Sequence, residues 1–187
     1  MAEGPDALDL IAAEHRMVED LFCRFENATE PQEKTEIVHE VIFELVVHGE
    51  VEEIAFYLRL RESLPDGNDL ADEAIQDHME MKETINALDS MTAGDDCFDE
   101  LMRGLMAEVR DHFKEEEAKL FPKVREAMTN TGLRKMGGRI MEARSLVPTR
   151  PHPSAPTGPL AKTAAGPPVT LVEWVRDALR SVADDNR

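Results

Sequence analysis

Residues 46–62 read VVHGEVEEIAFYLRLRE and place a histidine and a carboxylate on the apolar face of an expected helix. His48 lies among valines, and Glu52 follows four residues later, which puts both side chains on one side of an α-helix. The same spacing recurs at His112 and Glu116, within the stretch RDHFKEEEAKLFP. Polar groups such as these are costly to bury without partners. The repeated pair therefore indicates a buried polar site.

The fold class follows from the spacing of apolar residues. They recur at intervals of three and four along four segments between residues 6 and 128, as expected for helices with one apolar face. Pro31 and the stretches SLPDGND and TAGDD interrupt the pattern near residues 30, 65 and 94. Long helices joined by short connections pack antiparallel. The sequence therefore predicts an all-α fold, an up-down-up-down four-helix bundle.

The chain divides into four parts. The predicted bundle occupies residues 1–128, and residues 129–146 read as a short helical segment. Residues 147–169 contain seven of the eleven prolines and are expected to form a linker. Residues 170–187 read as an amphipathic helix followed by a tail. The last two parts form a C-terminal extension beyond the bundle.

The composition limits the classes of partner. Asp and Glu total 39 against 21 Lys and Arg, so the formal net charge is −18. Such a chain is repelled by nucleic acid and by anionic membrane surfaces, and we expect neither as a partner. Cys23 and Cys97 form no metal-like or redox-like pair, and the N-terminus has no long apolar run. These features favour a cytoplasmic location.

Each predicted helix carries one histidine on its inward face. Counting residues from the three turns puts all four at a similar level, within roughly 5 Å at about 1.5 Å per residue. Four imidazoles and two carboxylates in one layer form a ligand set for a pair of transition-metal ions, with the carboxylates as bridges. The predicted ligands are His15, His48, Glu52, His78, His112 and Glu116.

The order H…HxxxE…H…HxxxE on four helices resembles the hemerythrin-like (HHE cation-binding) family. The matching stretches are LIAAEHRMVEDLF, ELVVHGEVEEIAFYLRLRESLPDGNDLADEAIQDHMEMKETI and VRDHFKEEEAKLFPKVREAM, which cover most of residues 8–128. The C-terminal extension is similar to that of some bacterial members. The resemblance implies two non-haem iron ions, bridged by carboxylates and compatible with an oxo or hydroxo bridge. The six predicted ligands would hold them.

The resemblance also implies a small-molecule ligand, namely O2, peroxide or NO, for sensing, storage or detoxification. Oxygen carriers of the family have HxxxH on the third helix, whereas Lys82 here follows His78 by four residues, which argues against reversible oxygen carriage. Enzymatic activity stays open, with catalase-like peroxide decomposition and NO handling as candidates. The alternative is a regulatory or interaction protein with a mainly structural metal. It would bind a protein partner through the helix at 170–187.

Neighbouring residues receive other interpretations. Glu117 is an alternative ligand on helix four, but a residue at i+4 lies about 40° around the helix from His112 and one at i+5 about 140°. Glu116 is therefore preferred. Glu53 is expected on a solvated acidic face. Tyr57 is expected in ordinary core packing, with a place in the wall of the pocket as the alternative.

Overall fold

The computed structural model describes residues 4–146, and every regular element in that range is helical. Four long antiparallel rods form a bundle, which confirms the all-α architecture expected from the sequence. Two of the rods contain a short π-helical turn. The elements are α1 (Ala7–Asn27), α2 (Pro31–Val51), η1 (Glu52–Phe56), α3 (Tyr57–Ser63), α4 (Gly67–Asp89), α5 (Phe98–Glu115), η2 (Glu116–Leu120), α6 (Phe121–Ala127) and α7 (Asn130–Leu146).

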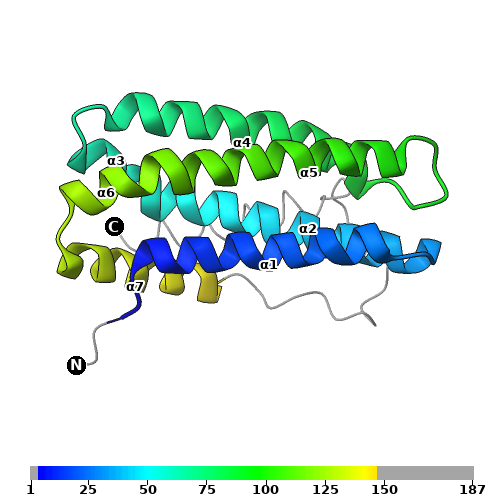
Figure 1. The fold of residues 1–187 in the computed structure, drawn as a ribbon, viewed down its shortest axis with the longest axis horizontal. Coiled ribbons are helices and arrows are strands. Elements are labelled where there is room, and N and C mark those ends of the chain that lie inside the picture. Colours follow the sequence, from blue (N-terminus) through cyan, green and yellow to red (C-terminus); the bar gives the residue numbers. More distant parts are fainter. Residues whose placement is uncertain (1–3, 147–187) are drawn as a thin grey trace, which may run out of the picture.

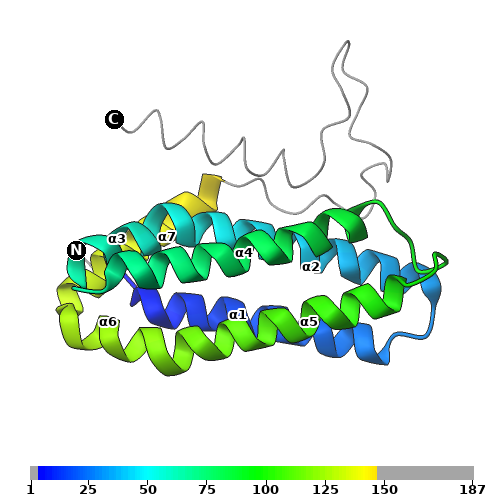
Figure 2. The same cartoon turned by 90° about the horizontal axis from the view of Figure 1, so that it is seen from above.

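The rods lie along one common axis, as Figures 1 and 2 show from two directions. The first and third rods are α1 and α4. The second is the continuous series α2–η1–α3, and the fourth is α5–η2–α6. The remaining helix, α7, packs on α1, η1 and α2 at the end of the bundle where α3 and α6 lie (Figure 1).

Local sequence signals set the helix ends. The Asp6 side chain accepts a hydrogen bond of 2.9 Å from the backbone N–H of Leu8 and so caps α1. Pro31 begins α2, where its missing N–H costs nothing. Cys97 precedes α5 in the left-handed region, with φ at 67°. These ends give the rods similar lengths and bring their middle turns to one level.

The π-turns η1 and η2 occur at equivalent points of the second and fourth rods. In each case the first residue of the turn is a predicted ligand, Glu52 or Glu116. The backbone N–H of Tyr57 donates to the carbonyl of Glu52, and that of Phe121 donates to Glu116, both five residues back. Each turn thus holds one residue more than an α-helical turn. Such turns are frequently found at functional sites.

One polar layer interrupts an otherwise apolar core. Among residues 4–146, eight polar or charged side chains are buried, and six of them are the predicted metal ligands. The other two are Glu44 and Glu50. Large apolar side chains, including Phe22, Phe56 and Phe98, fill the core on either side. Most of the buried polar side chains of residues 4–146 therefore lie in the predicted layer.

The segment at 129–146 contains one continuous helix, α7. The predicted linker at 147–169 and the predicted helix at 170–187 lie outside the described residues. Among residues 4–146, none of the helices combines the length and apolar character needed to cross a lipid bilayer.

Candidate metal centre

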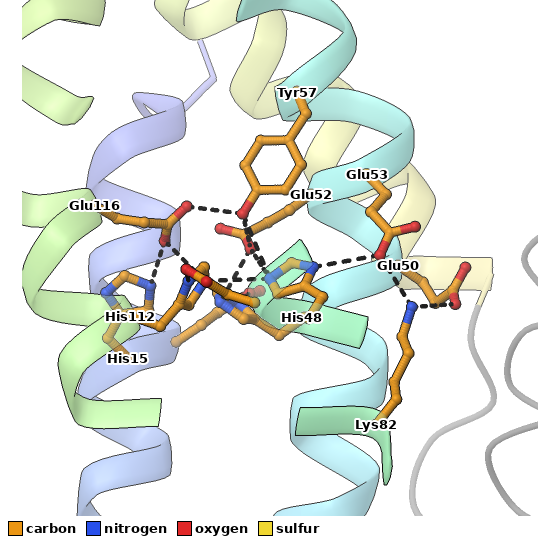
Figure 3. Close-up of polar contacts among 12 residues, drawn as sticks. His15, His48, Glu50, Glu52, Glu53, Tyr57, Lys82, His112 and Glu116 are labelled. Carbon is orange, nitrogen blue, oxygen red and sulfur yellow. Dashed lines mark hydrogen bonds and ion pairs between the residues drawn. The ribbon is translucent and has the colours of Figure 1, made fainter. Parts of the chain in front are cut away.

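The six predicted ligands converge in the bundle, and each is at most 4% exposed. Figure 3 labels all of them except His78. Their potential ligand atoms form two groups, with the atoms of each group within 4.8 Å of one another. Glu52 belongs to both groups, so the two lie side by side. The first group consists of His15, His48, Glu52 and Glu116, and the second consists of Glu52, His78 and His112.

The inward atoms of these side chains lie close to one another, but several of them form no hydrogen bond. His15 Nε2 lies 3.3 Å from a Glu116 oxygen, and His48 Nε2 lies 3.3 Å from a Glu52 oxygen. Within residues 4–146, both nitrogens and one oxygen of each glutamate lack a hydrogen-bond partner. Buried polar atoms without partners are rare and costly. Nitrogen and carboxylate atoms aimed at a shared point fit a transition-metal centre.

Four carboxylates orient the imidazoles from outside. A carboxylate only accepts hydrogen bonds, so the Nδ1 atom facing it must carry the proton, and Nε2 keeps its lone pair for the centre. This arrangement is typical of histidines that bind metals. The pairs and their distances are His15–Glu117 at 2.9 Å, His48–Glu14 at 2.9 Å, His78–Glu53 at 3.3 Å and His112–Asp77 at 3.4 Å.

Burial and mutual repulsion shape the charge of the layer. Burial raises the pKa of Glu52 well above its usual value, and the nearby Glu116 carboxylate raises it further. Burial also acts to raise the pKa of Glu116, but the adjacent His15 and His112 imidazoles outweigh it and lower that pKa to about 2. Burial lowers the pKa of His112 to about 4. A neutral imidazole beside carboxylates is the state that a metal ion requires.

A model of the family described as Hemerythrin HHE cation binding domain matches residues 6–124. The chain belongs to this family. The match spans all four rods and includes the six converging side chains. It confirms the family that the order of histidines and glutamates predicted.

A relative and a solved structure carry names that agree with the assignment. An uncharacterized hemerythrin-like protein of Schizosaccharomyces pombe is 26% identical over 172 residues, 91% of this chain and 85% of the relative. A Nostoc protein named DNA nickase is 25% identical over 142 residues, 76% of this chain but 40% of the relative. The crystal structure of an HHE domain-containing protein from Mycobacterium kansasii superposes with a TM-score of 0.66, covering 75% of this chain and 86% of that one. At 17% identity, that likeness shows the hemerythrin-like fold.

Tyr57 is a member of this HHE site, although the sequence favours core packing over a place in the pocket wall. Its hydroxyl lies 2.9 Å from a Glu116 oxygen and 3.1 Å from a Glu52 oxygen (Figure 3). It also lies 3.4 Å from His78 Nε2. Burial raises its pKa well above 10, and the two carboxylates raise it further, so the phenol keeps its proton. The expectation of plain core packing is wrong for the hydroxyl. The available signal was the spacing of five from Glu52, which only a π-turn places toward the centre.

Lys82 lies outside the group of converging side chains. Its Nζ is 3.0 Å from a Glu53 oxygen and 3.5 Å from a Glu50 oxygen. Glu53 contacts both Lys82 and the Nδ1 atom of His78, so its expected place on a solvated face is wrong. Burial opposes ionisation of Glu53, but these two partners outweigh it and lower the pKa to about 2. Lys82 therefore acts on the HHE centre only through a carboxylate.

The HHE bundle repeats its site residues at a constant interval. His78, His112 and Glu116 each follow their counterparts by 63 or 64 residues, as do the outer carboxylates. The π-turns and the helices after them follow the same offset. The repeat is broken at Tyr57, which corresponds to Phe121. The two halves of the centre are therefore similar in ligands and different in the side chain that covers them.

Proposed function

We propose that this HHE protein is a non-haem diiron protein that binds O2, peroxide or NO in the bundle core, for sensing, storage or detoxification. The observation that carries the proposal is the pair of buried donor groups that share Glu52. In this proposal the four histidines are terminal ligands, and Glu52 and Glu116 are bridges. Two iron ions held there would supply redox chemistry toward the small molecule.

The protein groups would hold and shield the centre. The outer carboxylates fix the four Nε2 atoms, which limits how far each imidazole can turn. Phe113 stacks on His15, with ring centroids 3.8 Å apart and an interplanar angle of 12°. Phe56 and Phe121 are also buried beside the layer. These apolar rings exclude water, which protects a reactive centre from side reactions.

We place the small molecule on the side of His78 and His112. Their group has three protein residues, whereas the group around His15 has four. A lysine at position 82 leaves the third rod with a single imidazole in the layer. The Tyr57 hydroxyl lies 3.4 Å from His78 Nε2, so it would donate a hydrogen bond to an anionic ligand bound there.

The first experiment is metal analysis with visible spectroscopy on anaerobically purified protein, before and after air and then peroxide. The expected result is about two irons per chain, with charge-transfer bands that change on oxidation. Oxygen evolution from added peroxide would assign catalase-like activity, and NO consumption would assign NO handling. Protein that does not bind iron on reconstitution, or that binds zinc and shows no spectral change, would contradict the diiron proposal. It would favour the regulatory alternative.

The regulatory alternative places the output in residues 147–187 and gives the metal a structural role. A chain ending at residue 146 distinguishes the two proposals. Full reactivity of the shortened protein with O2, peroxide or NO would show that the extension is not needed for the chemistry. Metal binding without reactivity in either form would support the alternative.

The DNA nickase relative does not add a nucleic-acid function to the proposal. This chain spans 40% of that protein. Its formal net charge of −18 opposes contact with DNA phosphates. Incubation of the iron-loaded protein with supercoiled plasmid checks this point, and we expect no nicked product.

A further inference from the structure

The helix α7 lies beyond the segment that matches the HHE family, yet it reaches the surroundings of the metal centre. Arg144, near its end, places Nη2 2.5 Å from a Glu44 oxygen and Nη1 3.0 Å from Glu14 Oε1. The other oxygen of Glu14 lies 2.9 Å from His48 Nδ1. A short path of polar contacts therefore runs from α7 through α1 to a predicted ligand on α2.

This path lies in a largely desolvated place. The Glu44 side chain is 5% exposed, that of Glu14 12% and that of Arg144 31%. Two carboxylates so placed repel one another, and the planar guanidinium can contact both at once. Without that cation, Glu14 would be drawn toward water and would hold His48 less firmly.

The other outer carboxylates support this interpretation. Glu53, behind His78, is 23% exposed and contacts the Lys82 ammonium group at 3.0 Å. Glu117 and Asp77, behind the remaining two histidines, are each 39% exposed and reach solvent. Among the four, the two less exposed carboxylates are thus the ones that contact a cation. For His48, that cation comes from outside the family segment.

The body of α7 is fixed firmly enough to position Arg144. Leu133, Met136 and Ile140 are at most 2% exposed and belong to the bundle core. Gly137 packs directly on the start of the chain, since a Cβ atom there would lie 2.1 Å from the carbonyl oxygen of Pro5. The helix therefore holds the guanidinium in a defined place.

We propose that Arg144 is a positioning residue for the His15–His48 half of the metal centre, and that α7 is part of the metal-binding unit. The inference rests on the proposed metal site. Arg144 holds Glu14, which holds His48 Nδ1, and so fixes the nitrogen that faces the ion. Loss of Arg144 would lower the affinity for the ion on the His15–His48 side and leave the affinity of the His78–His112 half unchanged.

The test uses the full-length, metal-free protein titrated with Co²⁺ alone in competition with a chelator. The main variant is Arg144→Met, which keeps the apolar stem and removes the charge. We expect one of two ions to bind about tenfold more weakly, at the low end of what outer hydrogen-bond partners contribute. The visible Co²⁺ bands of that ion should also shift. Arg139→Ala, an exposed arginine on the same helix, is the matched control and should bind as the wild type does.

Two further variants test the path itself. Arg144→Lys keeps the positive charge and should restore part of the affinity. Glu14→Gln should lower the affinity for the same ion. The double variant with Arg144→Met should lose little further affinity, because both residues act through one path.

Each outcome decides the inference. If Arg144→Met binds both ions with the affinity of the wild type and shows unchanged Co²⁺ bands, the role of Arg144 is overturned. The proposed metal site would not be affected by that result. Equal weakening of both ions, or additive losses in the double variant, would also overturn the role of Arg144. A wild-type protein that binds no Co²⁺ or iron would instead overturn the proposed function.

Discussion

Glu52→Gln should weaken the binding of both metal ions, because Glu52 belongs to both donor groups. Its Oε2 atom lies 3.3 Å from His48 Nε2 and 3.5 Å from His78 Nε2. Four-donor zinc sites bind with about 10–16 kcal/mol, so one donor accounts for about 2.5–4 kcal/mol, roughly a hundredfold to a thousandfold in affinity. The His15→Ala variant removes a member of the first group only and should weaken a single ion by this amount.

Thermal unfolding with and without metal gives the measurement. At a free metal concentration about 1,000 times Kd, each bound ion adds about 4.1 kcal/mol, and after a hundredfold weakening it adds about 1.4 kcal/mol. Glu52→Gln should therefore lose about 5 kcal/mol of metal-induced stability, and His15→Ala about half of that. The metal-free Glu52→Gln protein should be at least as stable as the wild type. The replacement removes a carboxylate that burial and Glu116 disfavour.

Two results would refute this reasoning. Wild-type affinity for both ions in Glu52→Gln would show that the shared carboxylate is not a bridge. Equal loss of both ions in His15→Ala would show that the donors form a single site. A His39→Ala variant on α2, outside both donor groups, serves as a control and should keep both ions.

Other changes have equally defined outcomes. Gly137→Ala should destabilise the protein by at least about 1–3 kcal/mol, since its Cβ would overlap the Pro5 carbonyl. At Gly138 an added Cβ would meet no atom within 4 Å, so Gly138→Ala should stabilise the protein by up to about 1 kcal/mol. Chemical denaturation measures the free energy of unfolding of both variants. Tyr57→Phe should keep two irons but slow the spectral change with peroxide at least about tenfold in stopped-flow experiments, because a hydrogen-bond donor at the centre is lost. An unchanged rate would exclude that role. Lys82→Met should keep both ions and lower affinity by about tenfold or less, as seen by chelator competition, because Lys82 acts only through Glu53. Loss of an ion would instead make Lys82 part of the direct ligand set.

The polar layer could be expected from the sequence because the α-helical periodicity alone puts its side chains on the inward faces. Spacings of four keep His48 with Glu52 and His112 with Glu116 on one helix face, whatever the rest of the fold does. Counting from the breaks then aligns the rods. The choice of Glu116 over Glu117 rests on the same geometry, and the structure turns Glu117 toward His15 Nδ1 instead.

Other parts of the site depend on features that this periodicity does not describe. Tyr57 reaches the centre because the π-turn shifts the helix that follows it, and no spacing rule for an α-helix anticipates that. The contact of Glu14 with Arg144 joins residues far apart in the chain. It depends on how closely α7 approaches α1 at Gly137. Such contacts follow from the packed fold and cannot be read from local patterns.

The extra residue in each π-turn has a consequence for how such a centre can change during evolution. If η1 closed into an ordinary α-helical turn with all of its residues kept, α3 would rotate by about 100° relative to α2. His48 and Glu52 precede the change and would keep their spacing, while Tyr57 would leave the centre. Substitutions that favour α-helical over π-helical hydrogen bonding in η1 could thereby exchange the side chain above the metals and keep the ligands. The chemistry of the pocket could then change during evolution while the residues that bind the metal stay the same.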